Sequence, residues 1–290
     1  MTELAASLVL KIPAALGETP VWSAASNRLY WIDCPTRQVH RFDPASGQDE
    51  VLPIEGLEGN LGSIALAADG GMLILCGKQL HHLAPGSRKP TLLAAAEPER
   101  AENNPNDGKV DPQGRFWFGT MHASVAQPTG SLYRFAGGKV TKMDSGFACS
   151  NGLAWSPDGT RLYFVDMMPG DPLAYDSDGR GGTIPNRRVF AHFDGSEGLP
   201  DGICGDASGG IWVAHWGGGC VTRYNSAGRR THKVAIPAPH VTCPIFGGPD
   251  LKTLYVTTSA DGVIDKAPLA GSLFAVEPPT GGLPVPAFRG

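Results

Sequence analysis

The sequence has few charged residues and no long apolar run. Asp, Glu, Lys and Arg together make up only 18% of its 290 residues, whereas glycine and proline contribute 39 and 25 residues. No stretch approaches the ~20 consecutive apolar residues that a membrane helix needs. This balance favours many short strands joined by tight turns over long surface helices. We therefore expect an all-β protein that does not associate with a membrane.

An excess of positive charge and a secretion signal are also missing. The formal net charge is -4, and the basic residues are scattered, so no basic face is available to a nucleic acid. Glu3 stands where a signal peptide would be basic, and Lys11 interrupts the first apolar run. The six cysteines form no C-x-x-C pair, which predicts free thiols in a reducing compartment. These features predict a cytoplasmic protein and leave its oligomeric state open.

One pattern recurs along the whole chain: a turn rich in Asp, Gly, Ser or Asn, followed by a strand with an aromatic or branched centre. The six copies are SNRLYWID, DGGMLILC, QGRFWFGT, DGTRLYFVD, SGGIWVAH and LKTLYVTT, and their aligned positions lie 43 to 49 residues apart. Each copy is preceded by a shorter strand and followed by another strand and turn, so a unit holds at least three strands, with a fourth before the next unit. A β-sandwich would have irregular spacing. The near-equal periods instead predict a six-bladed β-propeller of four-stranded antiparallel blades around a central channel.

The domain organisation follows from the same repeat. Residues 1–290 are expected to form a single propeller domain, because no linker or change in composition divides them. The stretch from Ser7 to Ile12 precedes the first inner strand. We expect it to pair as the outer strand of the last blade, since closing the ring would remove exposed sheet edges.

Four polar residues share one phase of the repeat. Glu18, Asn106, Asn151 and Asp201 each lie 10 or 11 residues before the aligned strand position. Residues at one phase point into the channel at one height, so these side chains should converge. Two carboxylates and two amide oxygens suit Ca²⁺, Mg²⁺ or Mn²⁺. A single Asn or Asp before a strand is more often a turn cap, whereas four at one phase favour one divalent metal ion.

The sequence carries no signature of an activated nucleophile. It contains no G-x-S-x-G motif. The apolar neighbours of Cys243 predict a packed thiol. Asn60 could be a substrate contact or a turn residue. His122 and His215 each follow a strand core, where a histidine could border a pocket or belong to a turn.

Several long motifs occur in a fixed order along the chain. They are LGETPVW around Glu18, NDGKVDPQGRFWFGTM from Asn106, SNGLAWSPDG around Asn151, LPDGI around Asp201 and FGGPDLKTLYVTT from Phe246. In these motifs the sequence resembles the gluconolactonase family, which includes regucalcin (senescence marker protein), the luciferin-regenerating enzymes and bacterial sugar lactonases. The motifs cover most of the chain from Leu16 to Thr258.

The resemblance implies a six-bladed propeller with one divalent ion in its channel, which could be Ca²⁺, Zn²⁺, Mn²⁺, Mg²⁺ or Fe²⁺. It implies that Glu18, Asn151 and Asp201 are metal ligands and that Asp201 is also the acid/base residue. Asn106 would be a further ligand or a substrate contact.

Two positions depart from the family pattern. Asn104 stands where members usually place a substrate-binding arginine, and the segment that begins with His122 lacks a glutamate that some members carry there. Asn104 and His122 are therefore candidate substrate contacts, and the departures leave the identity of the lactone open.

The expected activity is metal-dependent hydrolysis of a sugar-derived lactone, an aldonolactone, to the sugar acid in carbohydrate catabolism. The metal would polarise the ring carbonyl while Asp201 directs a water molecule onto it. One alternative is an arylesterase or phosphotriesterase of paraoxonase type. Another is a calcium-binding protein without catalytic activity.

Overall fold

The computed structural model describes residues 1–168 and 170–290, and nearly all of its regular structure is β-strand. Its one 3₁₀ helix within the described residues is η1 (Gly195–Glu197). No helix in this part of the chain has the length and apolarity that crossing a membrane requires.

Four sheets are antiparallel and have four strands each, in which strands consecutive along the chain are neighbours. Their strands are β3 (Gly17–Ser23), β4 (Arg28–Asp33), β5 (Gln38–Asp43) and β6 (Gln48–Val51); β7 (Leu61–Leu66), β8 (Met72–Cys76), β9 (Gln79–Leu83) and β10 (Thr91–Ala95); β11 (Asn103–Val110), β12 (Phe116–His122), β13 (Gly130–Ala136) and β14 (Lys139–Phe147); and β15 (Ser150–Trp155), β16 (Arg161–Asp166), β17 (Pro172–Asp176) and β18 (Arg188–Val189).

The fifth sheet has nine strands and contains two antiparallel meanders. Its strands are β19 (Leu199–Gly205), β20 (Ile211–Trp216), β21 (Cys220–Tyr224) and β22 (Arg230–Ala235); β23 (His240–Gly247), β24 (Thr253–Ser259) and β25 (Leu273–Val276); and the N-terminal β1 (Thr2–Ala5) and β2 (Ser7–Leu10). One residue pair, Trp216 with His240, joins the two meanders. β1 pairs in parallel with β22, and β2 pairs antiparallel with β25, so the N-terminus binds the two meanders together.

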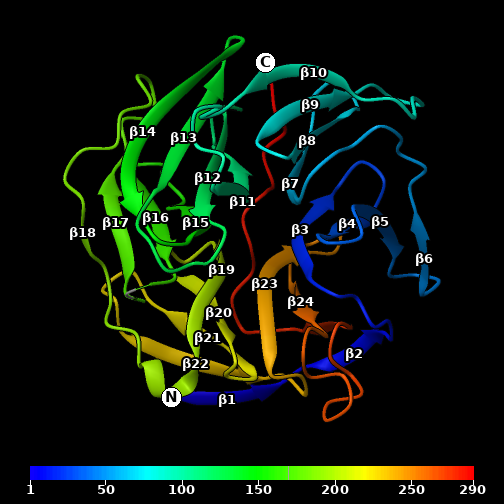
Figure 1. The fold of residues 1–290 in the computed structure, drawn as a ribbon. Coiled ribbons are helices and arrows are strands. Elements are labelled where there is room, and N and C mark those ends of the chain that lie inside the picture. The colour runs from blue at the N-terminus through cyan, green and yellow to red at the C-terminus, as the bar shows by residue number, and fades with distance from the viewer. Residues whose placement is uncertain (169) are drawn as a thin grey trace.

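The first strand of each repeat lies innermost. β3, β7, β11, β15, β19 and β23 contact one another in that order, and β23 contacts β3, so they form a closed ring. Figure 1 shows the sheets radiating outward from this ring. The all-β propeller expected from the repeat is therefore confirmed.

Aromatic residues on the second strands fill the space between sheets. Trp31, Trp117 and Trp212 lie on β4, β12 and β20, and each is fully buried. Burial of a side chain of this size, about 150 to 250 Å², stabilises the fold by roughly 4 to 6 kcal/mol at about 25 cal/mol per Å² of apolar surface. The aromatic and branched centres seen in the sequence repeat are thus the core of the propeller.

Two inner hairpins are closed by a buried carboxylate. Asp111 in the β11–β12 turn accepts hydrogen bonds from Trp117 Nε1 at 2.8 Å and from the backbone N–H of Arg115 at 3.0 Å. Asp206 in the β19–β20 turn accepts one from Trp212 Nε1 at 3.1 Å. Each carboxylate also forms an ion pair with an arginine. The carboxylate therefore links the turn to the tryptophan six residues later, which fixes the hairpin geometry.

The last residues cross one end of the channel, and we call residues 281–289 the C-terminal strap (Figure 1). Its backbone hydrogen bonds join Gly281 O to Ala207 N, Gly282 N to Leu251 O, Phe288 N to Leu66 O and Arg289 N to Gly114 O. Phe288 is buried and stacks on Phe135 with ring centroids 5.6 Å apart. The strap therefore ties separate parts of the ring together.

Candidate active site

The inner strands carry β-bulges at one level of the channel. In β3, β11, β15, β19 and β23 the pairing shifts so that three steps along the inner strand match two along its partner. Asn106, Asn151 and Asp201 are each the first residue inside a bulge, whereas Glu18 is the last regularly paired residue before one. A bulge bends its strand and redirects a side chain. The phase shared by these four residues in the sequence thus corresponds to a repeated backbone irregularity, with Glu18 offset by one residue.

Glycines inside two bulges let adjacent inner strands approach closely. A Cβ on Gly152 would lie 2.5 Å from the backbone nitrogen of Ile203, and one on Gly202 would lie 2.6 Å from Cβ of Cys243. Real Cβ atoms do not approach this closely, so only glycine fits at these positions. These glycines directly follow Asn151 and Asp201, and they hold the two site residues on touching strands.

Contacts with neighbouring groups hold the candidate residues. The side chain of Asn151 lies near enough to the Asp201 carboxylate to oppose the rise in its pKa. Asn106 Nδ2 donates to the carbonyl oxygen of Ser150 at 2.8 Å, which links β11 to β15. Glu18 Oε2 accepts from the backbone N–H of Thr19 at 2.9 Å. Asn106 therefore uses its amide nitrogen on a protein acceptor and leaves Oδ1 for a ligand.

The carboxylates lie close enough to perturb one another. Burial, followed by the charges of Asp201 and Asp107, raises the pKa of Glu18 well above its ordinary value. Burial also raises the pKa of Asp201, and the charge of Asp107 raises it further, whereas the nearby Asn151 amide opposes the rise. Three carboxylates gathered away from water disfavour their own ionised forms unless a cation is present. The electrostatics of the site therefore suit a bound cation.

The residue types at the site decide whether the metal ion that the resemblance implies could bind here. Among the described residues, no group of three or more His, Cys, Asp or Glu side chains is arranged to hold a metal. A site here must therefore combine carboxylates with amide oxygens. The carboxylates of Glu18 and Asp201 and the amide oxygens of Asn151 and Asn106 make an all-oxygen set, which fits a hard divalent cation.

Two further charged residues belong to the same region, although the phase of the repeat did not identify them. Asp107 is the second residue of the β11 bulge and is only 3% exposed. Lys109 follows two residues later, and its Nζ donates to the carbonyl oxygen of Ile203 at 2.6 Å. The sequence signal was present in the NDGK segment, but the repeat comparison selected only its asparagine.

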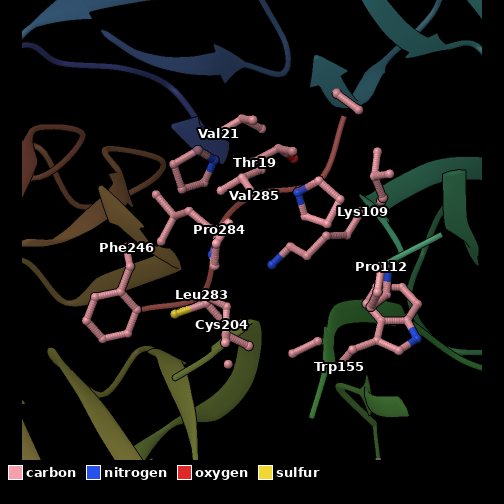
Figure 2. Close-up of a pocket in the computed structure, with 18 of the residues that line it drawn as sticks. Thr19, Val21, Lys109, Pro112, Trp155, Cys204, Phe246, Leu283, Pro284 and Val285 are labelled. Atoms are coloured by element: carbon pink, nitrogen blue, oxygen red, sulfur yellow. The ribbon is translucent and has the colours of Figure 1, made fainter. Parts of the chain in front are cut away.

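A cavity of about 400 Å³ lies further along the inner strands, and we call it the inner chamber. Its walls are mainly apolar and include Ile64, Val110, Ile245 and Phe246. Asp107 and Lys109 line the chamber from the side of the carboxylates, and Leu283, Pro284 and Val285 of the strap line it as well. Figure 2 shows the side chain of Lys109 reaching toward the strap residues across this space. The inner chamber is thus the part of the channel between the carboxylates and the strap.

Comparisons with known proteins agree with the motifs and the fold. A family model described as SMP-30/Gluconolactonase/LRE-like region matches residues 16–260. The chain belongs to this family. The region matched by the SMP-30/Gluconolactonase/LRE-like model contains every candidate residue discussed above, whereas the C-terminal strap lies after it.

Individual relatives match over nearly the whole chain. Regucalcin of Bos taurus is 35% identical over 287 residues, which cover 95% of each protein. Pentonolactonase XacC of Haloferax volcanii is 32% identical over 286 residues, again 95% of each. The crystal structure of a calcium-binding protein, regucalcin, from Agrobacterium tumefaciens str. C58 superposes with a TM-score of 0.94 at 32% identity, covering 100% of this chain and 99% of that one. This SMP-30/gluconolactonase family assignment confirms the resemblance seen in the sequence.

The candidate substrate contacts lie just outside the bulged region. Asn104 is partly exposed and pairs with Met121, so it precedes Asn106 on β11. His122 is partly exposed at the end of β12, and its Nδ1 lies 2.7 Å from Ser124 Oγ. Both residues come from the β11–β12 pair and lie on the side of the bulge away from the hairpin turn. Asn104 and His122 stand where this chain differs from the SMP-30/gluconolactonase family pattern, so they remain candidate substrate contacts.

Two residues that the sequence raised as possible site residues, Cys243 and His215, are buried among packed neighbours. Cys243 is 2% exposed, and burial raises the pKa of its thiol well above the ordinary value, so it is a poor nucleophile. His215 is 1% exposed and hydrogen-bonded through both ring nitrogens, to Glu197 O at 3.0 Å and to Thr222 Oγ1 at 2.7 Å. All six cysteines are buried and free of disulfides, which confirms the expectation of free thiols.

Proposed function

We propose that this protein hydrolyses a sugar-derived lactone to its hydroxy acid with the help of one divalent cation. The observation that carries the proposal is the cluster of Glu18, Asn151 and Asp201, which the bulges bring together inside the channel. Membership of a gluconolactonase family supports the reaction class, and a relative named as a pentonolactonase supports a sugar lactone as substrate. A relative described as a calcium-binding protein supports a metal-binding role for the cluster.

In this mechanism Glu18, Asn151 and Asp201 would hold the cation, and Asn106 would offer its amide oxygen to the ion or to the substrate. A bound divalent cation supplies Lewis-acid polarisation of the lactone carbonyl. Asp201 accepts a proton from the attacking water and returns it to the ring oxygen that leaves. Asn151 lies beside Asp201 and favours its ionised form, which is the form that accepts the proton.

Substrate recognition in the proposal rests on polar side chains. Asn104 and His122 contact the hydroxyl groups of the lactone beside the bulge of β11. With asparagine in place of a cation at position 104, selectivity would come from hydrogen bonds to neutral hydroxyls rather than from charge.

We also propose that the nine-stranded sheet counts as two blades. Its two meanders share a single residue pair, and the closed ring of inner strands has one member from each repeat. Residues 1–290 would then form one six-bladed domain that β2 closes by pairing with β25. The buried free thiols support a reducing compartment such as the cytoplasm.

The test is pH-stat hydrolysis of a panel of pentono- and hexonolactones with EDTA and with each divalent ion restored. We expect turnover that EDTA abolishes and an added ion restores. Asp201→Asn should lower kcat at least about 100-fold, because a general base contributes roughly that much. The control is Asp250→Asn, since the Asp250 carboxylate is 59% exposed in a surface turn.

The same panel separates the alternatives. Turnover of aryl esters or organophosphates without turnover of sugar lactones would favour an esterase of paraoxonase type. Tight ion binding without turnover of any substrate would favour a calcium-binding protein and would refute the hydrolase proposal.

A further inference from the structure

The candidate metal site has one more negative charge than a divalent cation can neutralise. Glu18 and Asp201 supply two carboxylates, and Asp107 in the bulge of β11 supplies a third that is only 3% exposed. A charge buried away from water must be compensated by a partner. One further positive charge is therefore needed near these carboxylates.

Asp107 itself lacks a complete set of partners. Its Oδ1 accepts from the backbone N–H of Gly108 at 2.7 Å. Its Oδ2 is buried and has no hydrogen-bond partner among the described residues. Such an acceptor is destabilising unless a nearby positive charge compensates for its lost hydration.

Lys109 occupies the position from which it can supply that charge. It lies two residues after Asp107 on the same strand, and both side chains line the inner chamber. Its Nζ is held by the carbonyl oxygen of Ile203, two residues after Asp201 on β19. The ammonium is thus anchored between the strand of Asp107 and the strand of Asp201, and Figure 2 shows it projecting into the chamber.

Within the described part of the chain, Lys109 forms no direct ion pair with a carboxylate. The charge of its ammonium group therefore acts on the carboxylates through space, without direct contact. The apolar walls of the inner chamber screen charges less than bulk water does, so this action extends further than it would at the surface.

We propose that Lys109 is a positioning residue whose ammonium balances the charge of Asp107, so that the channel is neutral when a divalent cation is bound. This inference rests on the metal site of the proposed function. Three carboxylates, one ammonium and one divalent cation have no net charge. Asp107 attracts the cation and Lys109 repels it, and the pair together sets the affinity of Glu18, Asn151 and Asp201 for the ion.

The test is a double-mutant cycle read by isothermal titration calorimetry with Ca²⁺. Asp107→Asn should weaken binding and Lys109→Met should tighten it, each about tenfold or more, as expected for one unit charge in a partly buried site. The double variant should return to within about threefold of the wild type, because its net charge is restored. Lys109→Arg should keep the wild-type affinity.

Lys78→Met is the matched control. Lys78 Nζ also donates to a backbone carbonyl, that of Arg100, so its loss removes a similar anchor without altering the charge around Asp107. It should leave the affinity for Ca²⁺ unchanged. Equal affinities in Lys109→Met, Lys78→Met and the wild type would overturn the inference and leave the metal site intact.

A second measurement keeps the two proposals separable. In EDTA, the urea midpoint should rise in Asp107→Asn, where repulsion is relieved, and fall further in Lys109→Met than in Lys78→Met. If the wild type binds no ion, the proposed metal site fails, and these midpoints alone decide whether Lys109 balances the carboxylates. Midpoints that fall equally in the two lysine variants would refute the charge-balancing role.

Discussion

The buried ring of His215 makes the stability of this protein depend on pH in a way that can be calculated. Burial is the main cause that lowers the pKa of His215 from 6.5 to about 4. Its Nδ1 donates to the carbonyl of Glu197, so its Nε2 accepts from the hydroxyl of Thr222 and the ring is neutral. Replacing it by His215→Asn keeps a donor for the Glu197 carbonyl and removes the titrating group.

The expected sign follows from where the proton binds. Between these two pKa values the unfolded chain binds more protons at this position than the folded protein, so the free energy of unfolding falls as the pH falls. The effect is absent near neutral pH, reaches about 2 kcal/mol near pH 5 and approaches about 3 kcal/mol below pH 4, at 1.36 kcal/mol per pKa unit.

The assay is urea unfolding of the wild type and His215→Asn near neutral pH and near pH 5. The variant is expected to be less stable near neutral pH, because it leaves part of the ring volume empty, but to lose about 2 kcal/mol less than the wild type on acidification. His192→Gln is the control, because it removes a histidine whose side chain is 92% exposed. If His215→Asn and the wild type lost the same stability on acidification, the reasoning about His215 would be wrong.

Three further predictions follow from the fold and the site. Asp206→Ala leaves the buried Arg223 guanidinium without its carboxylate, so the urea-derived free energy of unfolding should fall by about 3 to 5 kcal/mol; a loss below about 1 kcal/mol would contradict this role. Deleting the C-terminal strap should open the inner chamber and let a thiol reagent label Cys204 and Cys243, which line it, and unchanged labelling in a folded truncation would argue against closure by the strap. Ca²⁺ at about 100 times its Kd should raise the free energy of unfolding by about 2.7 kcal/mol, and Asp201→Asn should lose most of this gain; equal gains in both proteins would place the ion elsewhere.

Much of the architecture could be predicted because its signals are local. A turn residue followed by an aromatic or branched strand recurs at nearly constant spacing, and hydrophobic burial makes each such strand a core element. The closed ring of inner strands and the buried tryptophans correspond to that repeat. The joining of two meanders through Trp216 and His240 could not be foreseen, because it depends on how neighbouring sheets meet.

The candidate site was only partly predictable for a related reason. Counting residues along each repeat located Glu18, Asn106, Asn151 and Asp201, but a count cannot detect a bulge that shifts the register by one residue. The count did not select Asp107, whereas in the structure it is a buried carboxylate with an unpartnered oxygen.

The sequence by itself determined the strands, the turns and the residue types that face the channel, because these depend on side-chain chemistry and on spacing within one repeat. The tertiary structure alone decided which of them act together. Lys109 donates a hydrogen bond to the carbonyl of Ile203, which lies 94 residues later in the sequence. The strap, at the C-terminal end of the chain, lines the same chamber. Such contacts depend on closing the ring, and no local pattern encodes the distance between segments that only closure brings together.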